Sequence, residues 1–307
     1  MNQARAHCAI LPDRGVVAVS GSDAVTFLDN LVTNSLDKLE DGDARFSALL
    51  TPQGKILFEF LAVRTAEGFI LDTRREKVAD LVKRLTMYRL RAKVDIKDLS
   101  SDTAVAAVWW TPLGSQPTSF TYEADVLATF ADPRDPRLGL RIIARKTSDT
   151  SPIRHLDGAV MSNEASYHAT RIAAGIGEGG YDYPLGDTYP HEASYDLTNG
   201  VSFTKGCYVG QEVVSRMQNK TVVRKRVVHI EGSALASGAE VKVGDAAIGT
   251  VGSTYGTSAL ALVRLDRVAE ALDKSQPLTV RGAYVSIDPA AIARYRESVA
   301  NKPVIDL

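Results

Sequence analysis

The chain has 307 residues and a formal net charge of −1, and 45% of its residues are hydrophobic and 24% are charged. These values are typical of a soluble globular protein with two or three domains, and they imply no overall attraction to nucleic acid or membranes. No run approaches the roughly 18 apolar residues of a spanning helix, and no leader pattern is evident, so we expect a cytoplasmic monomer that contacts neither membrane nor nucleic acid directly.

The first hundred residues alternate between hydrophobic patterns typical of strands and of helices, which predicts an α+β sheet with helices on one face. Strands are predicted at residues 15–20, 46–50, 56–63, 69–72 and 94–96. Helices are predicted from Ser22 or Asp23, either of which can cap, to about residue 31, and over residues 75–88.

The rest of the chain changes character near residue 225. Before that point we predict strands at 104–110, 126–130 and 140–144, a helix at 161–174, and a long glycine-rich loop at 175–187. After it, short β segments separated by glycine-containing turns predict a small β-barrel or sandwich. These segments are 224–231, 240–243, 247–251, 259–263 and 278–285, with helices at 266–272 and 289–299.

The octet KGCYVGQE, residues 205–212, is the most informative segment because it contains one of the two cysteines. Gly206 and Gly210 allow a tight turn around Cys207, and the cations Lys205 and Arg216 favour its thiolate, the form that attacks or binds metal. The alternative is that Cys207 is a small buried hydrophobic residue in a structural turn, which is the usual fate of a free cysteine. The local chemistry leaves both interpretations open.

Ligand spacing argues against a metal site formed within this chain. Cys8 lies far from Cys207 and neither belongs to a Cys-x-x-Cys pair, so a disulfide framework and a self-contained zinc or iron–sulfur site are not expected. The five histidines show no His-x-x-x-His pattern. We therefore predict no metal ligands among the site residues.

Residues 203–216, FTKGCYVGQEVVSR, resemble the signature of the YgfZ family of folate-binding proteins. That family acts in iron–sulfur cluster maintenance and, through it, in tRNA modification, and it is related to the T-protein (aminomethyltransferase) of the glycine cleavage system. The resemblance extends to the segments RGVVAVSGSDA at 14–24, LTPQGK at 50–55 and YRLRAKV at 88–94. It implies a two-lobed folate-binding unit of T-protein type over residues 1–225, split near residue 100, followed by a C-terminal β-barrel over 226–307.

The resemblance also implies a ligand, tetrahydrofolate or a derivative, in the N-terminal unit. We expect its contacts to come from Lys205, Tyr208, Arg216, Arg14 and Tyr167, with Cys207 as the functional thiol. Arginine and lysine suit the carboxylates of a folate's glutamate tail, and aromatic side chains suit its ring system. The basic run around the octet has the alternative interpretation of a solvated charged face.

Two departures from the T-protein pattern bear on catalysis. Phe58 and Glu59 stand where T-proteins carry an Asp-Asp pair, and Ala173 stands where they place a glutamate against the pterin. Phe58 cannot accept a proton, and loss of the pterin anchor leaves ring nitrogens without a partner. The resemblance therefore supports the fold and folate binding better than aminomethyl transfer, and whether the chain is an enzyme stays open.

We accordingly expect a folate-dependent accessory protein for iron–sulfur cluster assembly or repair, with assembly or client proteins as partners and an indirect role in tRNA modification. The alternative is an active aminomethyltransferase, or a related tetrahydrofolate-dependent one-carbon enzyme, that uses Glu59 as its carboxylate. A third interpretation is a non-catalytic binding module in which the octet is only a structural turn. Cys207 favours the first, since transferase chemistry needs no thiol.

Overall fold

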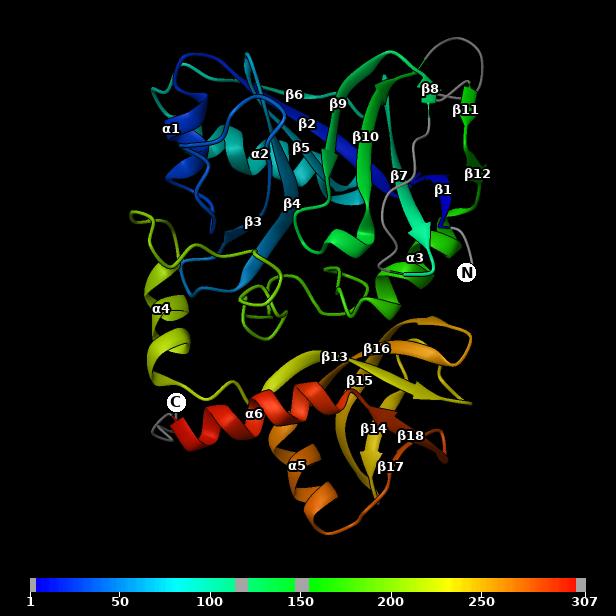
Figure 1. The fold of residues 1–307 in the computed structure, drawn as a ribbon. Coiled ribbons are helices and arrows are strands. Elements are labelled where there is room, and N and C mark those ends of the chain that lie inside the picture. Colours follow the sequence, from blue (N-terminus) through cyan, green and yellow to red (C-terminus); the bar gives the residue numbers. More distant parts are fainter. Residues whose placement is uncertain (1–3, 114–120, 147–154, 302–307) are drawn as a thin grey trace. The chain divides into compact units, whose positions relative to one another are not determined.

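The computed structural model describes residues 4–113, 121–146 and 155–301 (Figure 1). The described residues form two compact units that interleave along the sequence. Unit 1 comprises the residues up to Leu49, Phe58–Thr170 and Thr198–Val209, and unit 2 comprises Leu50–Leu57, Arg171–Leu197 and the residues from Gly210 onward. Each unit has its own sheet structure and is described separately.

The first sheet of unit 1 has five strands in the order β3-β4-β5-β2-β6, and the pairs β2–β5, β2–β6 and β4–β5 are antiparallel. Its strands are β2 (Arg14–Ser20), β3 (Ala44–Leu50), β4 (Ile56–Thr65), β5 (Gly68–Arg74) and β6 (Asp95–Asp98). Helix α1 (Ala24–Asp29) follows β2, and a 3-10 turn η1 (Arg75–Lys77) leads into helix α2 (Val78–Arg89). Helix α2 packs on β2 and β6 through its buried residues Val78, Leu81 and Leu85. The predicted amphipathic face is therefore the face that meets the sheet.

The second sheet of unit 1 has the strand order β12-β1-β7-β10-β9 and recruits the first strand of the chain. Its strands are β1 (Arg5–Ile10), β7 (Thr103–Thr111), β9 (Val126–Ala131), β10 (Leu140–Arg145) and β12 (Ala159–Met161), and β8 (Thr121–Glu123) pairs separately with β11 (His155–Asp157). A 3-10 turn η2 (Pro136–Leu138) precedes β10, and helix α3 (Glu164–Ala173) follows β12. The sequence did not predict β1, because its pairing partners lie a hundred or more residues away.

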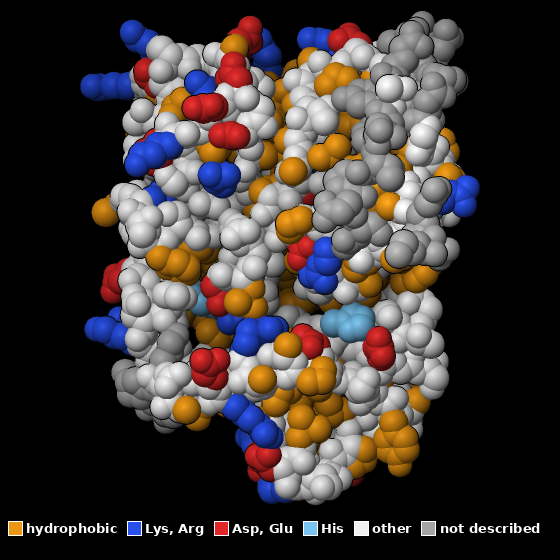
Figure 2. All heavy atoms as spheres, in the orientation of Figure 1, with side chains coloured by type: hydrophobic (Ala, Val, Ile, Leu, Met, Phe, Trp, Pro, Cys, Tyr) orange, Lys and Arg blue, Asp and Glu red, His pale blue; other side chains and the backbone are white. Residues whose placement is uncertain are grey.

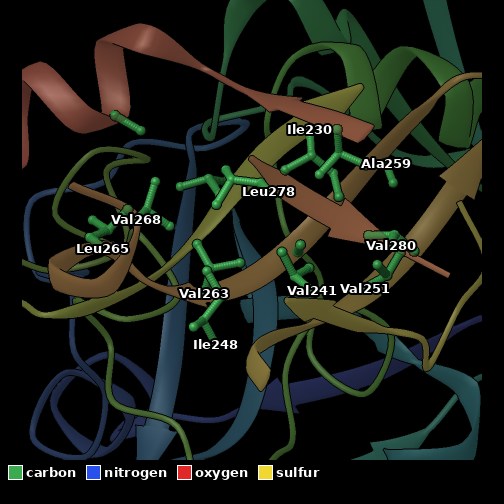
Figure 3. Close-up of a cluster of buried hydrophobic side chains, with 14 of the residues drawn as sticks. Ile230, Val241, Ile248, Val251, Ala259, Val263, Leu265, Val268, Leu278 and Val280 are labelled. Carbon is green, nitrogen blue, oxygen red and sulfur yellow. The ribbon is translucent and has the colours of Figure 1, made fainter. Parts of the chain in front are cut away.

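Unit 2 contains a closed barrel with the strand order β13-β16-β15-β14-β17-β18. The strands are β13 (Lys225–Gly232), β14 (Glu240–Val243), β15 (Ala246–Tyr255), β16 (Ser258–Arg264), β17 (Leu278–Val280) and β18 (Ala283–Ile287), with helices α5 (Leu265–Asp273) and α6 (Pro289–Asn301). Ile230, Val263 and Val280 point into a common apolar core, in which each is at most 1% exposed (Figure 3). The predicted C-terminal barrel is confirmed.

Unit 2 also contains helix α4 (Gln211–Lys220), which begins directly after the octet's second glycine. The sequence analysis predicted a turn there and no helix. Val214 and Met217, three positions apart, are its buried residues, so the signal was a short apolar pair on an otherwise polar helix. The α+β fold class is confirmed, with the barrel as a separate sheet structure.

Candidate functional site

The two cysteines lie in opposite environments. Cys207 is exposed, in an irregular segment of unit 1, whereas Cys8 is fully buried in β1 opposite Val108 and Met161. Burial raises the pKa of the Cys8 thiol to about 11. The structure therefore excludes the interpretation of Cys207 as a buried hydrophobic residue and assigns that role to Cys8.

Lys205 anchors the octet to the end of helix α1. Its Nζ donates hydrogen bonds to the carbonyl oxygens of Asp29, Val32 and Asn34 at 2.5, 2.9 and 2.8 Å, and it lies 3.5 Å from the Asp29 carboxylate. Asp29 is the last residue of α1, where a cation is favourable, and Val32 and Asn34 belong to the segment that follows the helix. The Lys205 side chain is 1% exposed, and burial lowers its pKa although Asp29 opposes that effect. All three of its donors are used inside unit 1.

Tyr208 provides a second anchor on the other side of the cysteine. It is 7% exposed, its ring centroid lies 5.4 Å from the Lys205 Nζ, and burial raises its pKa to about 12. Residues on both sides of Cys207 are thus buried and held, while Cys207 itself faces outward. The local sequence presents a thiol on a fixed segment.

The octet's two glycines serve different purposes. Gly210 has φ +81°, in the left-handed region, and a Cβ there would lie 2.7 Å from the Thr51 carbonyl oxygen within unit 2. This glycine is required by backbone conformation and by close packing at the start of α4. Gly206 has no atom within 4 Å of the place where a Cβ would stand. The residue directly before Cys207 is therefore surrounded by open space and would tolerate a side chain.

Arg216 lies on α4, where its half-exposed side chain is 3.7 Å from the Glu212 carboxylate one turn earlier. It lines a groove of about 530 Å³ in unit 2, together with Arg224 and Lys225. The groove also has an apolar lining, Val213, Met217, Val222 and Val223. Burial raises the pKa of Glu192, which lines it as well. Cations beside an apolar surface suit an anionic ligand with an apolar body.

Arg14 and Tyr167 lie in a buried polar network of unit 1. The Arg14 Nε donates to the Asp72 carboxylate at 2.7 Å, and its Nη2 donates to the Asp72 carbonyl at 2.9 Å. Arg141 connects these residues to Tyr167: its Nη2 donates to the Tyr167 hydroxyl at 2.5 Å, and its Nε lies 3.8 Å from the Asp72 carboxylate. Two of the predicted ligand contacts are thus joined through two residues that the sequence analysis missed.

Asp132 and Arg134 complete this network. Arg134 donates from Nε and Nη2 to the Asp132 carboxylate at 3.0 and 2.8 Å, and from Nη2 to the Tyr167 hydroxyl at 3.2 Å. Burial alone would raise the pKa of Asp132, but the Arg134 and Arg141 guanidinium groups outweigh burial and lower it. The signal that could have revealed the network is a charged residue within an apolar strand, as at Asp72 and Arg141.

The two departures from the T-protein pattern lie in different environments, and Phe58 and Glu59 belong to unit 1. Phe58 and Glu59 belong to β4 and are 6% and 4% exposed, and the Thr73 hydroxyl donates to the Glu59 carbonyl oxygen at 2.7 Å. Ala173 ends helix α3, belongs to unit 2 and is exposed. Neither position adds evidence for transferase chemistry.

Charged side chains of both signs are mixed on the face of the molecule that Figure 2 shows, with Lys and Arg interspersed among Asp and Glu. Among the described residues, no helix is both long and apolar enough to span a bilayer. A hollow of about 690 Å³ in unit 1 is lined by residues just before the octet, including Phe203, which is 46% exposed, and by Arg45.

Comparison with known proteins identifies the two parts of the fold. A family model for the GCVT N-terminal domain matches residues 12–110, and one for the CAF17 C-terminal β-barrel domain matches residues 224–294. The crystal structure of glycine cleavage system aminomethyltransferase T from Bartonella henselae superimposes with a TM-score of 0.71, covering 94% of this chain and 87% of that one. At 17% identity this likeness establishes the fold alone.

Sequence relatives narrow the family further. The chain is 32% identical over 264 residues to the mouse iron–sulfur cluster assembly factor IBA57, covering 80% of this chain and 72% of the relative. The human protein of that name is 32% identical over 234 residues, covering 72% of this chain and 65% of the relative. A Neurospora crassa homologue is 31% identical over 250 residues, or 75% of this chain, which spans about half the length of that relative, 55%.

The relatives correct one prediction and refine another. They are named as mitochondrial proteins, which contradicts the predicted cytoplasmic setting; the missing leader pattern on which that prediction depended carries no information about location. The resemblance to an iron–sulfur-related family of T-protein type is confirmed, but the relatives are IBA57 proteins and the YgfZ family itself is not identified. The chain belongs to the IBA57 family of iron–sulfur cluster assembly factors.

Proposed function

We propose that this chain is an accessory protein in iron–sulfur cluster assembly, in which Cys207 offers its sulfur to a cluster carried by a partner assembly protein. The observation that carries the proposal is the exposed Cys207 thiol between two buried anchors, Lys205 and Tyr208. A fixed, accessible thiolate is the form of cysteine that binds iron. The family relationship supports the same conclusion.

The number of thiols in the chain implies a shared site. Iron–sulfur clusters are usually held by four cysteine thiolates, whereas this chain has two cysteines, of which Cys8 is buried and has a raised pKa. Cys207 can therefore supply one ligand, and the others must come from a partner protein or a small thiol. The chain is therefore expected to bind a cluster only together with a partner protein or a small thiol.

The proposal is tested by rescue of cells depleted of their own IBA57 protein. Wild-type chain should restore the activities of a panel of iron–sulfur enzymes, and Cys207→Ser, which preserves size and removes the sulfur, should not. Cys8→Ala is the matched control and should rescue once protein levels are equalised. Full rescue by Cys207→Ser at equal protein level would refute the role of this thiol.

Tetrahydrofolate binding is the second part of the proposal. It is supported by the family resemblance and by the match to the GCVT N-terminal domain. The Arg216 groove fits such a ligand, because Arg216 and Lys225 can bind carboxylates beside an apolar surface. By contrast, Arg14 and Tyr167 are hydrogen-bonded inside unit 1, so we assign them to holding the fold rather than to direct ligand contact.

Calorimetric titration with tetrahydrofolate under anaerobic conditions tests this part. We expect a Kd in the micromolar range, about −8 kcal/mol, if several polar contacts form. Arg216→Ala should weaken binding about tenfold, whereas Arg267→Ala, an exposed arginine on α5, should not. The absence of heat at millimolar folate would refute folate binding but leave the thiol proposal standing. An indirect effect on tRNA modification is expected only as a consequence of cluster supply.

A further inference from the structure

We propose that Asp13, Glu164 and His168 form a binding site for a divalent transition-metal ion such as Zn²⁺ in unit 1, separate from Cys207. One ligand atom from each of the three side chains lies within 4.8 Å of the other two. The His168 Nε2 is 3.6 Å from the Glu164 carboxylate and 3.9 Å from the Asp13 carboxylate. All three side chains are partly exposed, so an ion can reach them from solvent.

The separations are close to those of a coordinated ion. Two ligands that bind Zn²⁺ at 2.0–2.2 Å with a tetrahedral angle lie about 3.4 Å apart. The two observed separations exceed this value by only a few tenths of an ångström. The third pair, the Asp13 and Glu164 carboxylates, lies within 4.8 Å, and binding requires side-chain rotation that draws the three ligand atoms together.

The ligands come from two segments that the fold fixes next to each other. Glu164 and His168 are four positions apart on α3, so they face the same side of the helix. Asp13 belongs to the turn between β1 and β2, where its carbonyl accepts a hydrogen bond from the Arg75 backbone N–H at 2.7 Å. The Arg75 side chain donates from Nε to the Pro12 carbonyl oxygen, so its guanidinium group is bonded to the backbone.

The buried polar network holds the neighbours of both segments. Arg14, next to Asp13, is bonded to Asp72, and Tyr167, next to His168, is bonded to Arg141. The Tyr167 ring also lies 5.8 Å from the His168 ring. Support of this kind orients ligands before the ion arrives, which reduces the entropy lost on binding.

The ligand set indicates the kind of ion. One imidazole nitrogen and two carboxylate oxygens suit a borderline divalent ion such as Zn²⁺ or Fe²⁺ better than the all-oxygen sites that select Mg²⁺ or Ca²⁺. Affinity at such a site should follow the order Zn²⁺ above Fe²⁺ above Mn²⁺. Three protein ligands leave at least one position open to water or to a further ligand.

The sequence predicts no metal site because none of its candidate ligands follows a short-range ligand spacing. Here the first ligand precedes the other two by about 150 residues, and only the adjacency of the β1–β2 turn and α3 brings them together. The Glu164–His168 spacing was visible, but one carboxylate and one histidine on a helix are usually an ordinary ion pair. That ordinary ion pair is the alternative that the experiment must exclude.

The test uses the full chain with any affinity tag removed and with Cys207→Ser, so that the exposed thiol does not bind metal. Zn²⁺ is titrated by calorimetry, and Co²⁺ is titrated by its visible absorption, which reports coordination geometry. We expect one equivalent to bind, and Glu164→Gln and His168→Gln each to weaken the affinity at least tenfold. His7→Gln is the matched control and should bind as the parent does.

Far-UV circular dichroism and thermal unfolding establish that each variant is folded. Glu164→Gln is the variant least able to disturb folding, since Glu164 is the most exposed of the three ligands. The proposal is overturned if the parent shows no saturable binding at micromolar metal. It is equally overturned if both variants bind as tightly as the parent.

Discussion

In the folded protein, iodoacetamide should alkylate Cys207 at least 100 times faster than Cys8. Alkylation requires the thiolate, and burial raises the pKa of Cys8 to about 11 from an ordinary value of 9.0. A rise of two pKa units lowers the thiolate fraction at neutral pH about 100-fold, because each unit is a factor of ten. Complete burial in β1 slows Cys8 further, since the strand must open before reagent can enter.

The assay is time-resolved alkylation at pH 7.5 followed by mass spectrometry of the two cysteine-containing peptides. The control is the same reaction in denaturant, where both thiols are exposed and their rates should agree within a few fold. Native rates for the two cysteines within tenfold of each other would refute the reasoning. That result would mean either that the second sheet opens readily or that the octet shields its thiol.

Three further predictions concern stability, each measured by denaturant unfolding. Gly210→Ala should destabilise the protein by about 1–3 kcal/mol, because an L side chain is strained at a positive φ and meets a carbonyl there, whereas Gly206→Ala should be nearly neutral. Lys205→Met should cost about 2 kcal/mol, since it leaves three partly buried carbonyls without this donor. The pKa of Asp132 is lowered in the folded state, so its charge stabilises the fold above about pH 4. This contribution is lost as the pH falls through the lowered pKa, so the difference in unfolding free energy between wild type and Asp132→Asn should shrink in acid.

Each of these predictions has an outcome that contradicts it. Equal effects of alanine at the two glycines would mean that the left-handed conformation at Gly210 is not required. A Lys205→Met variant as stable as wild type would show that the carbonyls find water or another donor. A constant difference between wild type and Asp132→Asn from pH 7 to pH 3 would show that folding does not lower the pKa of this carboxylate.

Much of the fold was predictable because its signals are local. The amphipathic pattern of residues 75–88 predicted α2, and glycine-spaced β segments predicted the barrel. The β1 strand was not predictable, since it pairs on both sides with strands that are remote in sequence, β7 and β12. Helix α4 was missed for a different reason: two buried residues in a polar segment give little periodic signal.

The candidate site was predictable as a list of residues but not as an arrangement. The sequence singled out Cys207, which the structure shows to be exposed, and it assigned Lys205 to the thiol and the ligand, whereas the Lys205 amine bonds to the carbonyls of Asp29, Val32 and Asn34. Residue type alone does not reveal whether a cation is exposed or bound by carbonyls. Asp72 and Arg141 were overlooked because they lie on different sheets and are remote in sequence, so only the fold brings the two side chains within 3.8 Å.

The central claim is that the Cys207 sulfur contacts iron, and one anaerobic reconstitution tests it directly. The chain is incubated with Fe²⁺, sulfide and glutathione, which supplies the remaining thiolates, and visible absorption and Cys207 alkylation are followed together. We predict charge-transfer absorption with wild type, none above background with Cys207→Ser, and protection of Cys207 from iodoacetamide while the absorption persists. Equal absorption with Cys207→Ser, or unchanged alkylation of Cys207 in the reconstituted protein, would contradict the claim.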